Sequence, residues 1–154
     1  EIARARRDEE PLTLLMFDID HFKAINDRLG HQAGDRVLVE VTRRIQSHLR
    51  AVDVLGRWGG EEFIVLLPRC GGGDVFQVAE KLRVLIANPP IPEIGVVTAS
   101  FGVGDLMSEE HFAHWLKRVD DALYQAKTSG RNRVCLAGPE DLASGAPQGG
   151  VGVN

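Results

Sequence analysis

The 154 residues are predicted to form one domain, a mixed α/β sandwich. Short apolar runs typical of strands alternate along the chain with segments of helical periodicity. Two of the strands are separated by Gly59-Gly60, which predicts a tight antiparallel hairpin because both positions tolerate positive φ. We therefore expect helices packed against a sheet that contains this hairpin.

The start of the chain is predicted to place one strand between two helices. Residues 2–10 have the pattern of the end of a charged helix, and the apolar run 12–19 has the length of a buried strand. Asp20 can then cap an amphipathic helix that Gly30 ends.

The middle of the chain is predicted to contain a second helix and the hairpin. Apolar residues at helical spacing begin at about Asp35 and continue to Leu49. The hairpin strands follow at about 53–58 and 62–67.

The remainder is predicted to supply two more helices and two more strands. An amphipathic helix covers roughly 75–85, and a strand covers 94–104. A long helix runs from Phe112 to near Gly130, and a short strand covers 132–136. Residues 138–154 are rich in Gly and Pro, so we expect a flexible tail after a domain of residues 1–137.

Composition excludes several classes of protein. The formal net charge of −4 lacks the footprint of a non-specific nucleic-acid binder. No apolar run approaches the ~20 residues that span a bilayer. Cys70 and Cys135 have neither metal-site nor disulfide spacing, which favours a reducing compartment. We expect a cytoplasmic protein that binds no nucleic acid and has no membrane segment in this chain.

Carboxylates at a strand end and at a tight hairpin can converge without being buried, and this sequence has both. Asp18 and Asp20 lie where the first strand ends, and Glu61 and Glu62 lie in the hairpin. Oxygen-rich sites of this kind suit magnesium. Asp18 with Glu61 or Glu62 is therefore a candidate metal pair for phosphoryl or nucleotidyl transfer. The alternative is that Asp18 and Asp20 only end the strand and cap the helix.

Three separated stretches resemble the GGDEF-type diguanylate cyclase family, in its GGEEF variant. They are FDIDHFKAINDRLGHQAGDRVL at 17–38, RWGGEEF at 57–63 and YQAKTSGRNRV at 124–134. The resemblance covers residues 11–136 in the expected order. It implies an α+β fold with a mixed, mainly antiparallel five-stranded sheet flanked by helices, similar to the polymerase palm and the adenylate cyclase catalytic core.

The activity implied by the resemblance is condensation of two GTP into cyclic di-GMP, with release of two pyrophosphates. Each domain resembles half an enzyme, so a homodimer is needed for catalysis, whereas the isolated domain could be a monomer. The alternative is a catalytically silent receptor that binds cyclic di-GMP or GTP. Degeneration would show as loss of Asp18, Glu61 or Glu62, and none is lost.

The resemblance also implies the metal ligands and the catalytic groups. Two Mg²⁺ ions, with Mn²⁺ as the alternative, would be held by Asp18, Glu61 and the backbone carbonyl of Ile19. Glu62 matches a residue needed for catalysis, as base at the attacking hydroxyl or as organiser of the metals. Lys23 belongs to the catalytic set through phosphate binding.

The same family pattern implies how GTP binds. Asn26 and Asp35 match the pair that recognises guanine. A carboxylate can accept hydrogen bonds from the ring N–H and the exocyclic amine of this base. Lys127 and Arg131 would share a helical face unless Gly130 breaks the helix into a turn. The residues expected to bind phosphate are His21 and Phe22 through their amides, Gly59 and Gly60 through close approach of the backbone, and Lys23, Lys127 and Arg131.

Arg50 and Asp53 match the family's RxxD inhibitory site for cyclic di-GMP, with a surface salt bridge as the alternative. The family's N-terminal motif is missing, and no sensor domain is visible. We therefore expect an output domain of a longer sensor protein, whose remainder could lie in a membrane.

Overall fold

The structure is a computed structural model that describes residues 1–138. The elements in chain order are α1 (Ile2–Arg7), β1 (Leu12–Ile19), α2 (Phe22–Leu29), α3 (His31–His48), β2 (Val54–Arg57), β3 (Glu62–Pro68), α4 (Asp74–Ala87), β4 (Ala99–Asp105), α5 (Phe112–Thr128) and β5 (Val134–Leu136).

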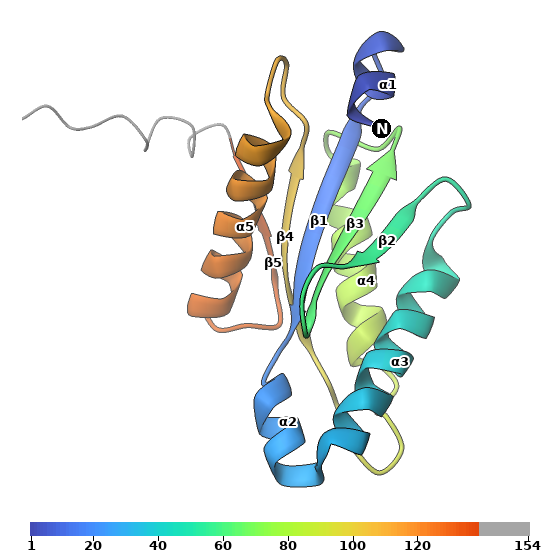
Figure 1. The fold of residues 1–154 in the computed structure, drawn as a ribbon, viewed down its shortest axis with the longest axis vertical. Helices are drawn as coiled ribbons and strands as arrows, with labels where there is room; N and C mark the ends of the chain where they lie inside the picture. The colour runs from blue at the N-terminus through green and yellow to red at the C-terminus, as the bar shows by residue number, and fades with distance from the viewer. Residues whose placement is uncertain (139–154) are drawn as a thin grey trace, which may run out of the picture.

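The five strands form one sheet in the order β2-β3-β1-β4-β5 (Figure 1). All neighbours pair antiparallel except β4 and β5, which pair parallel. The predicted five-stranded, mainly antiparallel sheet is therefore confirmed.

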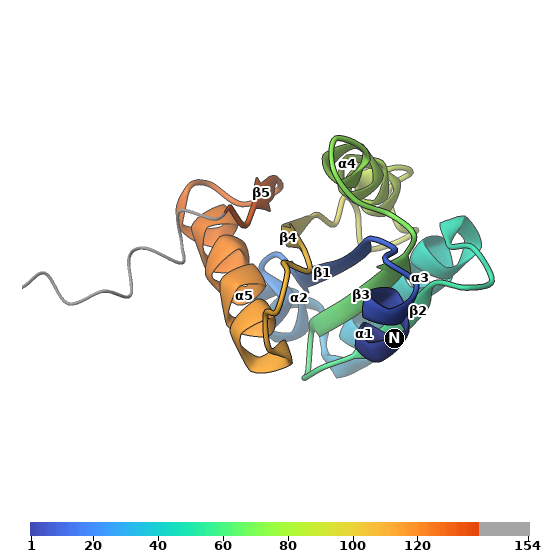
Figure 2. The ribbon, with the colours of Figure 1, turned by 90° about the horizontal axis from the view of Figure 1, so that it is seen from above.

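Helices cover both faces of the sheet, so β1 is buried along its whole length. Successive side chains of a strand point to opposite faces. Phe17 accordingly packs in the cluster formed with α3 and α4, whereas Met16 packs with Trp115 of α5 and with α1. Figure 2 shows the two layers, with α3 and α4 on one side of the sheet and α1 and α5 on the other.

Different segments lie at the two ends of the sheet. In Figure 1, α2, the end of β1 and the connection from β2 to β3 lie at the lower end, and α1 lies at the upper end. Because β1 and β3 are antiparallel, the last residues of β1 lie beside the first residues of β3, with Asp18 opposite Glu62.

The hairpin is confirmed, but the predicted reason for it is wrong. Four residues, 58–61, connect β2 to β3, and neither Gly59 nor Gly60 is among the glycines with positive φ. A four-residue connection does not need the positive φ angles that a two-residue turn requires.

The predicted cap of α2 and the predicted start of α3 are also wrong. The N-cap position of α2 is His21, in the left-handed region at φ 56°, and no side chain caps it. Helix α3 begins at His31, so Asp35 lies one turn inside it rather than at its start. Gly30, at φ 91°, both ends α2 and precedes α3, because a glycine in this conformation can redirect the chain between the two helices.

The fourth strand begins at Ala99, five residues later than predicted. The residues before it form a turn closed by an isolated bridge between Ile91 and Gly95. The predicted tail lies outside the described residues apart from Gly138, so the domain boundary stays a prediction. No helix in the described part of the chain has both the length and the hydrophobicity needed to cross a bilayer.

Candidate active site at the end of the sheet

Three acidic residues meet where β1 ends and β3 begins. Asp18 and Glu62 are cross-strand partners, and the Ile19 N–H donates to the Glu61 carbonyl over 3.3 Å. Side chains directly opposite each other in an antiparallel pair have Cβ atoms about 5 Å apart. The register of the sheet therefore brings together the carboxylates that the sequence pattern singled out.

Lys127 joins this group from α5. Its ammonium donates to Asp18 Oδ2, and 109 residues separate the two along the chain. The Asp18 side chain is 12% exposed and that of Lys127 is 34% exposed, so the contact is partly shielded from solvent. A cation thus already compensates part of the negative charge at this end of the sheet.

The surroundings of two of these carboxyls, Asp18 and Glu62, raise their pKa values. Burial raises the pKa of Asp18, with further effects from Glu61 and Asp20, and Lys127 opposes this rise. Burial also raises the pKa of Glu62, reinforced by the charges of Asp120 and Asp18. Asp120, on α5, is an acidic neighbour that the sequence analysis missed. Charges of one sign held together in this way favour binding of a further cation.

The oxygen atoms at this end of the sheet can supply only part of the coordination shell of a divalent ion such as Mg²⁺. Among residues 1–138, no three His, Cys, Asp or Glu side chains are arranged to hold a metal ion by themselves. Mg²⁺ does not require such a cage, because it binds one or two carboxylates and completes its shell with water and phosphate oxygens. Asp18, Glu61 and the Ile19 carbonyl can supply that smaller share.

Arg57 organises the hairpin tip, and the sequence analysis did not identify it. Its guanidinium donates to the carbonyls of Gly60 and Gly59, with Nε 2.8 Å from Gly60 O. The amides of Trp58 and Gly59 both donate to the Glu62 carbonyl. An added Cβ at Gly59 or Gly60 would meet nothing within 4 Å, so the tip is open toward solvent.

The predicted guanine readers lie on neighbouring helices. Asn26 is on α2 and Asp35 is exposed on α3. The two helices meet closely at Gly34, where a Cβ would lie 1.8 Å from Asn26 Oδ1. The Asn26 amide therefore lies against the residue that precedes Asp35. A glycine inside a helix often marks such close approach, and this signal was present in the sequence.

The predicted phosphate ligands lie around the same end of the sheet. His21 and Phe22 begin α2, and the exposed Lys23 lies in its first turn. Helix α5 ends at Thr128, and Arg131 lies beyond it at φ 63°. Lys127 and Arg131 therefore do not share a helical face, and of the two alternatives the turn is the correct one.

Arg50 and Asp53, the predicted product-binding pair, form an ion pair at the far end of β3. The Arg50 guanidinium donates to Asp53 over 2.8 Å and to the carbonyl of Pro68 over 2.7 Å. Six residue steps separate Glu62 from Pro68, which is about 20 Å in a strand. A cavity of ≈ 420 Å³ opens beside this pair, lined also by Arg69.

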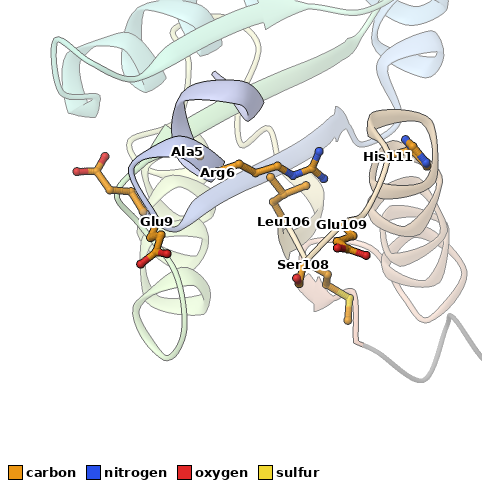
Figure 3. A pocket seen from close by; sticks show the side chains of 9 residues that line it. Ala5, Arg6, Glu9, Leu106, Ser108, Glu109 and His111 are labelled. Carbon is orange, nitrogen blue, oxygen red and sulfur yellow. The ribbon is translucent and has the colours of Figure 1, made fainter.

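A larger cavity, of ≈ 590 Å³, lies between α1 and the loop before α5. Figure 3 shows Arg6 from α1 opposite Glu109 and His111. None of the predicted site residues lines this cavity, and it lies at the end of the sheet opposite the carboxylates.

Comparison with known proteins gives consistent matches. Residues 1–133 match the family model described as "Diguanylate cyclase, GGDEF domain". The chain is 46% identical over 125 residues to "Diguanylate cyclase DgcM" of Escherichia coli, covering 81% of this chain and 30% of that protein. It is 41% identical over 139 residues to "Response regulator PleD" of Caulobacter vibrioides, covering 86% of this chain and 31% of that protein. The chain thus spans about a third of these relatives.

Solved structures agree with the observed fold. The GGDEF domain of DgcB from Caulobacter crescentus in complex with c-di-GMP has a TM-score of 0.84 at 34% identity, covering 88% of this chain and 83% of that chain. The active GGEEF domain of a diguanylate cyclase from Vibrio cholerae has a TM-score of 0.84 at 39% identity, with 89% of each chain covered.

Proposed function

Because the chain belongs to the GGDEF family of diguanylate cyclases, we propose that two copies of it condense two GTP molecules into cyclic di-GMP and two pyrophosphates. The observation that supports this proposal is the convergence of Asp18, Glu61 and Glu62 at one end of the sheet, within reach of Lys127. Each copy would hold one GTP, and the two copies would face each other antiparallel.

In each of two successive steps, the 3′-hydroxyl oxygen of one GTP bonds to the α-phosphorus of the other. The bond from that phosphorus to the pyrophosphate oxygen breaks, and the hydroxyl proton is lost. Glu62 is our candidate to accept that proton, because its raised pKa brings it closer to the range in which a carboxylate is an effective base. Its alternative role is to organise the metals.

Asp18, Glu61 and the Ile19 carbonyl would hold Mg²⁺ or Mn²⁺. Such ions neutralise triphosphate charge and make a hydroxyl oxygen more nucleophilic. When GTP is present, its phosphates offer Lys127 an anionic partner other than Asp18. Lys23 and Arg131 would add further positive charge, and the amides of His21 and Phe22 would add further donors. Gly59 and Gly60 would let the backbone come close to the phosphates.

Guanine selection would come from Asn26 and Asp35. The Asp35 carboxylate can accept from the ring N–H and the exocyclic amine of guanine, an arrangement that adenine lacks. Arg50 and Asp53 would bind cyclic di-GMP about 20 Å from the carboxylates and restrain the domains when product accumulates. A bidentate guanidinium suits a phosphate or a guanine edge.

The direct test is to incubate the chain with GTP and Mg²⁺ at several protein concentrations and to assay cyclic di-GMP. Activity per mole should rise with concentration, because two copies must meet. Glu61→Gln should nearly abolish turnover, since it removes charge at the metal site and keeps the shape. Glu9→Gln, the same change at a remote surface position, should not affect it. Absence of product at every concentration, together with binding of cyclic di-GMP, would favour the receptor alternative.

A further inference from the structure

The carboxylate of Asp20 joins three segments that are distant in sequence. It is buried, and its Oδ1 accepts from Ser100 Oγ at 2.6 Å. Its Oδ2 accepts from Thr98 Oγ1 at 2.7 Å and from the backbone N–H of Asn132 at 3.0 Å. Asp20 thus connects the end of β1 to the start of β4 and to the turn after α5.

That turn has an unfavourable backbone conformation. Gly130, Arg131 and Asn132 all have positive φ, at 129°, 63° and 45°. Residues other than glycine rarely have positive φ, so such a turn persists only where its surroundings hold it.

Four hydrogen bonds hold the turn in place. Arg131 N donates to the carbonyl of Ala126 at 2.9 Å, and Arg83 donates to Asn132 Oδ1 at 2.7 Å. The third runs from Arg133 Nε to the Arg131 carbonyl at 3.1 Å. The fourth is the bond from Asn132 N to Asp20. The Asp20 bond is the charge-assisted one that ties the turn to the end of β1, and bonds of that kind are about twice as strong as neutral ones.

We propose that Asp20 is a positioning residue for GTP, which holds the turn so that Arg131 points to the phosphates at the carboxylate end of the sheet. The proposal rests on the proposed function, in which Arg131 binds those phosphates. Asp20 does not touch the nucleotide. It bonds the backbone of Asn132 and acts through the adjacent residue, Arg131. Asp20 lies two residues after Asp18. Its side chain therefore connects the turn that carries Arg131 to the end of β1, where the candidate metal ligands lie.

The test measures binding of a non-reacting probe, α,β-methylene GTP with Mg²⁺, by calorimetry. Asp20→Asn keeps the shape but removes the negative charge and one acceptor oxygen, so the bond to Asn132 N loses its charge assistance or is lost. We expect binding to weaken about 10-fold to 100-fold, as for loss of a charge-assisted hydrogen bond to phosphate. Ser100→Ala is the matched control: it removes a different donor to Asp20, leaves the bond to Asn132 and should change affinity less than 3-fold.

A double-mutant cycle separates positioning from a general structural role. If Asp20 acts through Arg131, Asp20→Asn combined with Arg131→Ala should bind the probe no more weakly than Arg131→Ala alone. Amide exchange at Asn132 should be faster in Asp20→Asn, whereas cyclic di-GMP binding at the remote Arg50 site should not change. If Asp20→Asn does not fold, Asp20→Ser takes its place in the same cycle.

The outcomes distinguish the two proposals. Failure of the unmodified chain to bind the probe would overturn the proposed function and this inference with it. Binding by the unmodified chain, with equal affinity in Asp20→Asn or with additive losses in the cycle, would overturn the positioning role alone.

Discussion

Replacing Gly34 with alanine should separate nucleotide selection from folding stability. A Cβ at this position would lie 1.8 Å from Asn26 Oδ1 and 2.8 Å from its Cγ. Atoms cannot approach so closely, so the Asn26 side chain must turn away. That side chain is a flexible one on the neighbouring helix α2, and the backbone need not move.

The two effects of Gly34→Ala have opposite signs. Gly34 is inside α3 and is not among the residues with positive φ, so alanine should favour the helix by about 0.8–1 kcal/mol. Displacing Asn26 should cost one neutral hydrogen bond to guanine, about 0.5–1.5 kcal/mol, which weakens binding about 2-fold to 13-fold. We therefore expect weaker nucleotide binding in a protein whose folding is not weakened.

Calorimetry with α,β-methylene GTP and its adenine counterpart measures the binding, and thermal unfolding measures the stability. Gly73→Ala is the matched control, since a Cβ there would meet nothing within 4 Å. Asn26→Ala should reproduce the loss of guanine affinity, and the double variant should lose no more. Unchanged GTP affinity in Gly34→Ala would refute the assignment of Asn26 to guanine.

Three further predictions concern other parts of the molecule. Arg50→Ala should weaken cyclic di-GMP binding about 10-fold to 150-fold and relieve product inhibition, whereas equal affinity in calorimetry would leave only a surface salt bridge. Gly102→Ala should lower the free energy of unfolding by about 1–3 kcal/mol in denaturant titrations, because its Cβ would lie 2.3 Å from the Val119 carbonyl of the packed helix. Arg43 and Arg44 lower the pKa of Glu40 to about 2 from 4.5, so this carboxylate stabilises the fold above pH 4.5 and the effect is lost as pH falls toward 2. Glu40→Gln should remove that acid-dependent component from stability measured against pH, and an unchanged profile would contradict it.

The sequence alone was enough to predict the features that depend on neighbouring residues. The apolar run of β1 and the hairpin strands on either side of Gly59-Gly60 were predicted because strand patterns are local. Asp18 was placed with Glu61 and Glu62 from their positions at a strand end and a hairpin. The family was recognised from contiguous motifs, and the matches confirm it.

Contacts between distant segments were decided only by the tertiary structure. Asp20 was expected to cap a helix, but its donors lie 78, 80 and 112 residues away. Lys127 reaches Asp18 across 109 residues, and Gly34 matters because α2 and α3 pack closely there. A local pattern describes what a residue can do in its own segment. Which partner it has depends on how the sheet and its helices bring separate segments together, because a buried carboxylate needs donors from whichever segments pack around it.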